Sequence, residues 1–256
     1  MATGTIQGSI YIMKLLSLNM WQGRIGSILL NHLKSMDLDF ACMQEGVDYK
    51  GHSLGLVCPY QNVGSVLDLE NQFFSKLIST KLGSKSLGFG NVTYSNIPFT
   101  QTSTIFTRGE HKEDYDFDKD DYNIRAFQHV LIDINNKKLN ILNHHGHHID
   151  SHKLGDEETE RQVKQISDYI KTLEGAVILC GDFNLSPESK SIRLLDKSLR
   201  NLSVENKLTT TRSKLTYKNE VCDYIFVNDK VKINSFAMDE TIISDHNALI
   251  IDFDIE

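Results

Sequence analysis

Asp182 and Asn184 are the residues whose type and spacing first suggest chemistry. They follow the apolar run 176–180 (AVILC), which is typical of a strand buried on both faces, and Gly181 is expected to end that strand. Side chains two residues apart at a strand end lie on one face, where open sheets bind their ligands. The same residues also suit an ordinary strand-to-helix turn with Ser186 as the helix N-cap. This segment alone leaves both interpretations open.

Other strand-like runs end in, or begin with, similar polar residues. The set collected at these positions is Asn19, Glu45, His145, Asp182, Asn184, Asp223, Asp245 and His246. Carboxylates, carboxamides and imidazoles together suit a hard divalent cation such as Mg²⁺ or Mn²⁺, with neutral donors for an anionic substrate. Hydrolysis of a phosphate ester needs such a set: a metal, a base for water, and donors that stabilise charge in the transition state.

The elements that must position these residues alternate between apolar runs and amphipathic segments. Strands are expected at 13–18, 38–43, 88–94, 102–107, 125–134, 138–143, 176–180, 221–228, 231–238 and 247–253. Helices are expected at 25–33, 157–173 and 188–199, and the spacing of Phe73, Phe74, Leu77 and Ile78 fits a further helix. Asn135 and Asn136 predict a hairpin turn. We therefore expect one mixed α/β domain over 13–256, preceded by a tail or extension at 1–12.

Composition sets the broad class of the protein. Apolar residues make up 40% and charged residues 24%, as in ordinary soluble proteins. The net charge of −7 argues against a generally basic nucleic-acid-binding surface but allows a local basic groove. The four cysteines form no CxxC pair and no segment is apolar enough to span a membrane, so we expect reduced thiols and a cytoplasmic protein. The acidic segment 110–121 is expected to be a solvated loop, since it lacks the pattern of a calcium loop.

Six short segments occur in an order that resembles a known family. They are LNMW, MQE, NHHG, GDFN, CDYIFV and SDHNAL, and the resemblance covers almost the whole chain, from Met13 to Asp254. This order is similar to that of the endonuclease/exonuclease/phosphatase superfamily, which shares the pancreatic-type deoxyribonuclease fold. The resemblance implies a four-layered α/β sandwich of two packed mixed sheets flanked by helices, with the site at the strand ends.

The resemblance also implies which residues bind metal. Glu45 would be the principal ligand of Mg²⁺ or Mn²⁺, Asn19 would assist at the metal and the phosphate, and Asp245 would be a direct or indirect ligand. His144, His147, His148 and His152 could instead form a zinc site with His145, although no Cys or helix-spaced His pair supports it.

The remaining implied roles concern the phosphate and the attacking water. His145 would donate to the scissile phosphate, and Asp182 and Asn184 would position the water and the phosphate. His246 would be the general base or a phosphate-stabilising group, with Asp223 orienting its ring. Within the family the base is either the aspartate at the position of Asp182 or the histidine at that of His246, and both assignments stay open here.

The sequence departs from the family pattern at two places. Cys222 stands where relatives often carry a basic residue, which weakens a phosphate contact there, and Gly146 replaces the usual Leu after the histidine of the NHHG segment.

From these observations we expect a monomeric, Mg²⁺-dependent phosphodiesterase of nuclease type, acting on a phosphate ester such as nucleic acid. Two alternatives remain. One is a phosphomonoesterase for inositol, lipid or nucleotide phosphates, and the other is a binding module that has kept the fold without catalysis.

Overall fold

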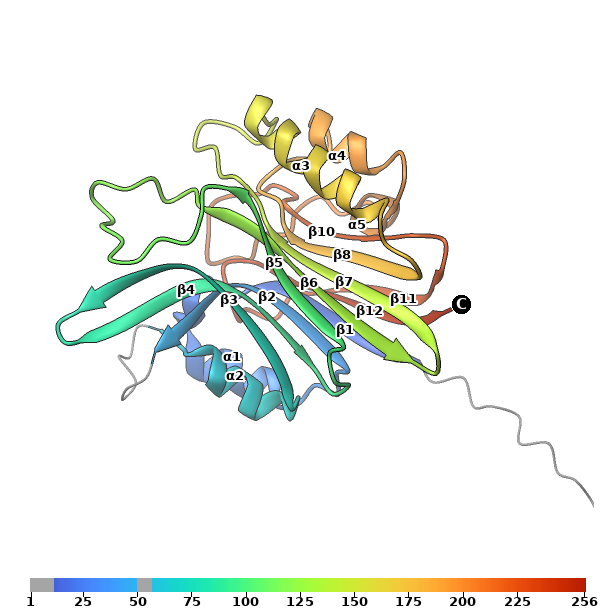
Figure 1. Ribbon diagram of the computed structural model, residues 1–256, viewed down its shortest axis with the longest axis horizontal. Coiled ribbons are helices and arrows are strands. Elements are labelled where there is room, and N and C mark those ends of the chain that lie inside the picture. Colours follow the sequence, from blue (N-terminus) through green and yellow to red (C-terminus); the bar gives the residue numbers. More distant parts are fainter. Residues whose placement is uncertain (1–11, 50–56) are drawn as a thin grey trace, which may run out of the picture.

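Two six-stranded mixed sheets form the centre of the computed structural model, which describes residues 12–49 and 57–256 (Figure 1). Except for Ile12, the predicted extension 1–12 lies outside the described residues. The first sheet has the order β11 (Val231–Asp239), β12 (Ala248–Ile255), β1 (Met13–Asn19), β2 (Phe40–Tyr49), β4 (Lys85–Ser95), β3 (Asn71–Leu82). The second sheet has the order β5 (Gln101–Arg108), β6 (Arg125–Ile134), β7 (Lys137–His145), β8 (Ala176–Asp182), β10 (Asp223–Val227), β9 (Arg200–Asn201).

Helices cover the outer face of each sheet, which makes four layers (Figure 1). On the first sheet lie α1 (Gly26–Leu33) and α2 (Tyr60–Leu67), and on the second lie α3 (Glu157–Ile170), α4 (Lys190–Leu195) and α5 (Leu202–Glu205). A 3₁₀ turn, η1 (Trp21–Gly23), follows β1. This arrangement confirms the predicted sandwich of two mixed sheets flanked by helices. Among the described residues, no helix has the length and apolarity needed to cross a membrane.

The central strands are apolar throughout because both of their faces are covered. In β1, Leu15 packs into the core between the two sheets, while Leu16 packs into the core under α1 and α2. In β8, Ile178 belongs to the core between the sheets and Leu179 to the core under α3 and α4. Side chains alternate across a strand, so a strand with two buried faces needs an uninterrupted apolar run. The sequence interpretation of 176–180 is confirmed.

The β6–β7 hairpin is built as predicted. Asn135 and Asn136 have φ angles of 52° and 64°, and Ile134 pairs with Lys137 across the turn. A two-residue turn with both φ values positive matches the twist of the flanking strands. The hairpin delivers His145 to the end of β7, beside the end of β8.

Three details of the predicted elements are wrong. The segment predicted as a helix around Phe73 and Leu77 is strand β3, paired along its length with β4. Gly181 does not end β8: it continues the strand at φ 136°, where a Cβ atom would lie 1.9 Å from the carbonyl oxygen of His144. Helix α4 begins at Lys190 with Ser189 as its N-cap, rather than at 187–188, because the Ser189 hydroxyl accepts the backbone N–H of Ile192.

Strand β2 also runs further than predicted. It does not end at Glu45 but continues to Tyr49 through a bulge, where the register to β4 shifts between Met43 and Gly46. Glu45 itself has a φ of 56°, a conformation that few non-glycine residues adopt. A bulge turns a side chain away from the regular alternation, so a backbone irregularity sets the direction of this carboxylate.

A network of buried amide groups links the two sheets behind the strand ends. Asn143 on β7 accepts from the side-chain amide of Gln44 on β2 at 2.7 Å and donates to the backbone oxygens of Met43 and Val92 at 3.1 and 3.0 Å. It also donates to Gln128 on β6 at 3.0 Å. Hydrogen-bonded polar groups of this kind fix the relative position of packed elements, because breaking any bond leaves a buried group unpaired.

Candidate functional site

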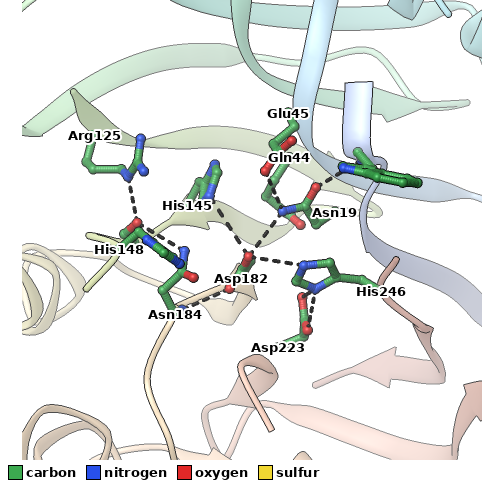
Figure 2. A network of polar contacts seen from close by, with 12 residues as sticks. Asn19, Gln44, Glu45, Arg125, His145, His148, Asp182, Asn184, Asp223 and His246 are labelled. Carbon is green, nitrogen blue, oxygen red and sulfur yellow. Dashed lines mark hydrogen bonds and ion pairs between the residues drawn. The ribbon is translucent and has the colours of Figure 1, made fainter. Parts of the chain in front are cut away.

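Six of the predicted site residues line one cavity at the edge shared by the two sheets, while Asn19 and Asp223 contact these residues without lining it. The cavity has a volume of about 410 Å³, and its walls include Glu45, His145, Asp182, Asn184, Asp245 and His246. Figure 2 shows how His145, Asn184 and His246 converge on Asp182, with Glu45 joined to it through Asn19. We call this space the central cavity. Strands of both sheets contribute to it, so neither sheet carries the site alone.

Asn19 connects the carboxylates of the two sheets. Its side-chain N–H₂ group donates to Glu45 Oε1 and to Asp182 Oδ2, each at 3.1 Å (Figure 2). Its side-chain oxygen accepts the backbone N–H of Trp21 at 3.0 Å. In this orientation the amide nitrogen, not the oxygen, faces the carboxylates. Asn19 was predicted to assist at the metal and the phosphate, and a direct contact between its side-chain oxygen and a metal would require the amide group to turn over.

Asp182 lies at the end of β8 and receives contacts from several directions. Its Oδ1 accepts the backbone N–H of Asn184 at 2.8 Å, which turns the chain out of the strand. Its Oδ2 lies 3.6 Å from His246 Nε2 and 3.9 Å from His145 Nε2. Asn184 has a φ of 56° and its amide nitrogen lies 3.4 Å from the backbone oxygen of Gly146. The predicted neighbours of the scissile phosphate are thus gathered around one carboxylate.

His246 is held by a buried carboxylate. Its Nδ1 donates to Asp223 Oδ2 at 2.8 Å, and the Thr211 hydroxyl donates to the same oxygen at 2.6 Å. This pairing fixes the ring, so that Nε2 points into the central cavity (Figure 2). The structure therefore brings Asp223 and His246 together as the sequence interpretation assumed.

Asp245 sits apart from this hydrogen-bonded group, on the cavity wall. It is half-buried in the loop before β12, and its backbone oxygen accepts the N–H of Ser213 at 3.0 Å. Its Oδ2 lies 4.0 Å from the Arg212 guanidinium. Within the described residues its carboxylate accepts a side-chain hydrogen bond from Ser244 at 3.3 Å. Asp245 therefore keeps carboxylate lone pairs that can bind a ligand in the cavity.

Two groups of side chains could hold a cation. Asp182, Asp223 and His246 bring ligand atoms within 4.8 Å of one another, but both ring nitrogens of His246 already have protein contacts, with Asp223 and with Arg212. Glu45 and Asp245 have fewer protein partners and are close enough to influence each other's charge. Their carboxylate oxygens are the donors that Mg²⁺ and Mn²⁺ prefer, so the residues fit such an ion. Within 12–49 and 57–256, the histidines at 144–152 do not form a further cluster of three or more metal-binding side chains.

Arg212 is a residue of the site that the sequence interpretation missed. It is 7% exposed, its Nη1 contacts His246 Nε2, and its buried Nε has no hydrogen-bond partner among the described residues. Arg212 lies near Cys222, which occupies the position where relatives of the family often carry a basic residue. The segment 208–220 has no helical or alternating pattern, so only the presence of a basic residue shortly before the CDYIFV segment could have pointed to it.

Two further cations stand at the cavity. Arg125 lines it and donates to the backbone oxygen of Gly146 at 2.6 Å, and burial lowers its pKa. Lys153 lies 3.4 Å from the side-chain oxygen of Asn184, and burial also lowers its pKa. The protein as a whole is acidic, yet buried cationic groups collect where an anionic substrate would bind.

The charges around the site shift several pKa values. Burial raises the pKa of Glu45, and the carboxylates of Asp245 and Asp182 add to this increase, while the hydrogen bond from Asn19 opposes it. Burial works against ionisation of Asp182, but the nearby His246 and Arg212 hold its pKa well below the usual value. Burial would lower the pKa of His246, yet Asp223 and Asp182 outweigh it and raise the pKa. Perturbed groups of this kind cluster at functional sites.

His145 differs from His246 in its electrostatic surroundings. Burial lowers its pKa well below the usual value, and the Arg125 charge adds to this effect. A neutral His145 can donate one N–H to an oxygen in the cavity without carrying a charge of its own.

Comparison with known proteins agrees with this geometry. The model of the Endonuclease/Exonuclease/phosphatase family matches residues 16–246. Comparison of the sequence with curated proteins gives no match.

Solved structures share the fold at low sequence identity. A member of the same family from Bacteroides vulgatus is 16% identical with a TM-score of 0.68, and the alignment covers 96% of this chain and 100% of that chain. The catalytic domain of human Nocturnin is 14% identical with a TM-score of 0.69 over 96% and 95% of the two chains. A mannosyl-6-phosphatase from Bacteroides thetaiotaomicron is 14% identical with a TM-score of 0.64 over 94% and 99%. By the family match over most of its length, this chain belongs to the endonuclease/exonuclease/phosphatase family.

Proposed function

We propose that the protein is a divalent-metal-dependent phosphodiesterase that hydrolyses a phosphate ester by attack of water. One observation carries the proposal: Glu45 and Asp182, from different sheets, share the amide group of Asn19 beside the imidazole of His246. An acidic side suited to a cation thus faces a side with hydrogen-bond donors suited to phosphate, within one cavity. The family is one of phosphoesterases, which supports the reaction class.

Glu45 and Asp245 would hold the metal ion, with Asn19 beside them. When bound, Mg²⁺ or Mn²⁺ would neutralise charge on a phosphoryl oxygen. The hydrogen bond from Asn19 fixes the position of Glu45 Oε1, and Gln22 lies 3.4 Å from Oε2. Such contacts orient a ligating carboxylate before any ion arrives.

Asp182 would position the attacking water. Its pKa is held low, so it is ionised and accepts a hydrogen bond from water at Oδ2, the oxygen that faces the cavity. Asn184 would contact the phosphate beside it. The backbone N–H of Asn184 fixes the carboxylate through Oδ1, which keeps Oδ2 directed at the substrate.

His145 and His246 would donate to the phosphate from two sides. Their Nε2 atoms flank Asp182 Oδ2 at 3.9 and 3.6 Å, so a phosphate placed beside that oxygen lies within reach of both. Asp223 holds the His246 ring through Nδ1, and Nε2, which contacts Arg212, would exchange that contact for one with the substrate. Donors fixed before the reaction stabilise the charge that develops in the transition state.

A metal-dependent activity panel tests the proposal. The substrates are single- and double-stranded DNA, RNA, a phosphotyrosyl oligonucleotide, sphingomyelin and inositol phosphates, each with Mg²⁺, with Mn²⁺ and after chelation. We expect hydrolysis of a diester that chelation abolishes and Mg²⁺ restores. Hydrolysis of monoesters alone would favour the phosphomonoesterase, and binding without turnover of any ester would favour the non-catalytic module.

The compartment is part of the proposal. All four cysteines are free and buried, which supports a reducing environment such as the cytoplasm. We further propose that residues 13–256 act as one domain and that the protein works as a monomer.

A further inference from the structure

A second cavity of about 520 Å³ opens beside the central cavity, and we call it the side cavity. Gln22, Glu45, Tyr122, Arg125 and His145 line both. Because the walls are shared, the two cavities adjoin, and a substrate with its phosphate near His145 would lie next to the side cavity. A volume of this size is typical of pockets that enclose a small organic group.

The far wall of the side cavity is apolar and aromatic. It consists of Leu77 and Ile78 from β3, Phe89 from β4, and Phe117 and Ile124 from the segment that precedes β6. The Phe117 side chain is 59% exposed, although a large apolar side chain normally avoids water. Its ring meets those of Phe89 and Tyr115 edge to face, with centroid distances of 5.8 and 4.9 Å. These contacts hold an exposed ring in place.

The segment that carries Phe117 is attached to β3. The backbone N–H of Ser79 donates to the Lys112 oxygen at 2.9 Å, and that of Tyr115 donates to the Ser79 oxygen at 2.7 Å. The Ser79 hydroxyl also donates to Glu113 at 2.7 Å. The wall is thus formed before a ligand binds, which reduces the entropy lost on binding. The segment 110–121 is largely exposed and irregular, as expected of a solvated loop, and an isolated bridge between Lys112 and Ile78 attaches it to β3.

Two arginines stand at the same cavity. The Arg24 guanidinium lies 5.0 Å from the centre of the Trp21 ring, and that of Arg125 lies 5.9 Å from the centre of the Tyr122 ring. Both are stacked on aromatic rings and present positive charge at the edge of an apolar wall. An acyl chain would give neither guanidinium an anionic partner, although Arg125 also donates to backbone oxygens. A flat aromatic group attached to a phosphate satisfies both features.

We propose that the side cavity binds the nucleobase of the nucleotide next to the scissile phosphate, with the base on Phe117 and a neighbouring phosphate near Arg24. The substrate class is then a single-stranded or dinucleotide phosphodiester, since only an unstacked base can enter such a cavity. The inference rests on the proposed function, because it places the scissile phosphate in the central cavity.

A binding measurement tests the proposal without turnover. Calorimetry on the full chain compares thymidine 3′- and 5′-monophosphates with methyl phosphate. We expect at least one nucleotide to bind about tenfold more tightly than methyl phosphate, the effect of stacking one base on an aromatic ring. We expect the ratio of nucleotide affinity to methyl phosphate affinity to fall about tenfold in Phe117→Ala. Phe117→Tyr, which retains the ring, should keep this ratio. Equal affinities for nucleotide and methyl phosphate in the wild type would overturn the proposal, whether or not the protein turns over any ester.

A kinetic comparison then identifies which of the two nucleosides flanking the scissile phosphate occupies the side cavity. The dinucleotide TpT is compared with two analogues in which one or the other thymidine is replaced by an abasic tetrahydrofuran. We expect kcat/KM to fall about tenfold for one analogue, and Phe117→Ala to remove that difference. Val204→Ala, which shortens an exposed apolar side chain on α5, is the control and should keep it. Preferred hydrolysis of sphingomyelin vesicles, sensitive to Phe117→Ala, would assign the cavity to an acyl chain and overturn the nucleobase.

Discussion

The Nδ1 atom of His246 lies 2.8 Å from Asp223 Oδ2, and this contact turns Nε2 of the same ring toward Asp182, 3.6 Å away. We therefore expect Asp223 to influence the proposed reaction through the ring that it holds. Since it does not line the central cavity, replacing it changes the orientation and protonation of His246 without removing a group that contacts substrate.

Asp223→Asn should reduce kcat about 100-fold with a smaller effect on KM, because the amide no longer favours the N–H on Nδ1. Steady-state kinetics on the best diester of the panel measures this. Asp229→Asn, in the exposed turn after β10, is the matched control. A kcat within twofold of the wild type would show that the His246 ring does not depend on Asp223.

Asp182→Asn and His246→Gln should each lower turnover by about 100- to 1,000-fold, as expected when a group that acts in the transition state is removed. Both substitutions keep the shape of the side chain approximately, so the circular dichroism spectrum should be unchanged. Turnover like that of the wild type in either variant would contradict the site assignment.

Glu45→Gln should raise the concentration of Mg²⁺ that gives half-maximal activity, and excess Mg²⁺ should restore part of the lost rate. The reason is that a neutral amide is a weaker ligand than a carboxylate for a hard cation. Titration of Mn²⁺ binding by calorimetry provides a second readout that needs no substrate. Glu205→Gln, which removes an exposed ion pair with Arg200, should change neither the Mg²⁺ dependence of activity nor the affinity for Mn²⁺. An unaltered metal dependence in Glu45→Gln would exclude Glu45 as a ligand.

Asn143→Leu should lower the free energy of unfolding by about 2–4 kcal/mol. The change removes the buried amide that joins the sheets. Gln44 then loses its shorter side-chain hydrogen bond, and the backbone oxygens of Met43 and Val92 each lose a donor. Urea denaturation measures the effect. Asn206→Leu, at an exposed position, should change the free energy of unfolding by less than about 0.5 kcal/mol.

His144 should make the fold sensitive to acid. Burial and the Arg125 charge lower its pKa to about 3, whereas the unfolded chain has a value near 6.5. The folded state therefore binds fewer protons, so stability is full above pH 6.5 and falls as the pH drops from 6.5 toward 3. The contribution of one such histidine is about 1.4 kcal/mol per pH unit.

His144→Phe keeps a ring that can pack against Phe183 but cannot titrate. In urea denaturation between pH 6 and 4, its free energy of unfolding should decline less steeply than that of the wild type, by about 1.4 kcal/mol per unit. Equal slopes for the two proteins would mean that His144 is not the group responsible.

The fold could be predicted where apolar patterning and burial agree. The run 176–180 is a strand with two buried faces, and its composition shows this directly. In β3 the pattern misleads, because the residues on the buried face include Ser75 and Ser79, which pair with Thr104 and Glu113. Buried serines hide the alternation, and the remaining apolar residues then have the spacing of a helix.

The site could be predicted where its residues adjoin strands. Asp182 and His246 were found in this way and lie 3.6 Å apart, although 64 residues separate their numbers. Arg212 could not be found, since it lies in a segment without periodicity and reaches the site only through tertiary packing. The direction of the Glu45 side chain was also hidden, because a bulge with a positive φ leaves no clear mark on the sequence.

The order of the strands determines when, during synthesis of the chain, the residues of the site can come together. Strand β1 lies between β2 and β12, and Met13 pairs with Phe253. While the ribosome is still adding the C-terminal residues, one edge of β1 has no neighbour, and Asp245 and His246 have not yet been delivered. Contacts so distant along the chain form slowly. A nascent chain can therefore complete the second sheet first, and it gathers the full set of candidate site residues only after β12 has emerged.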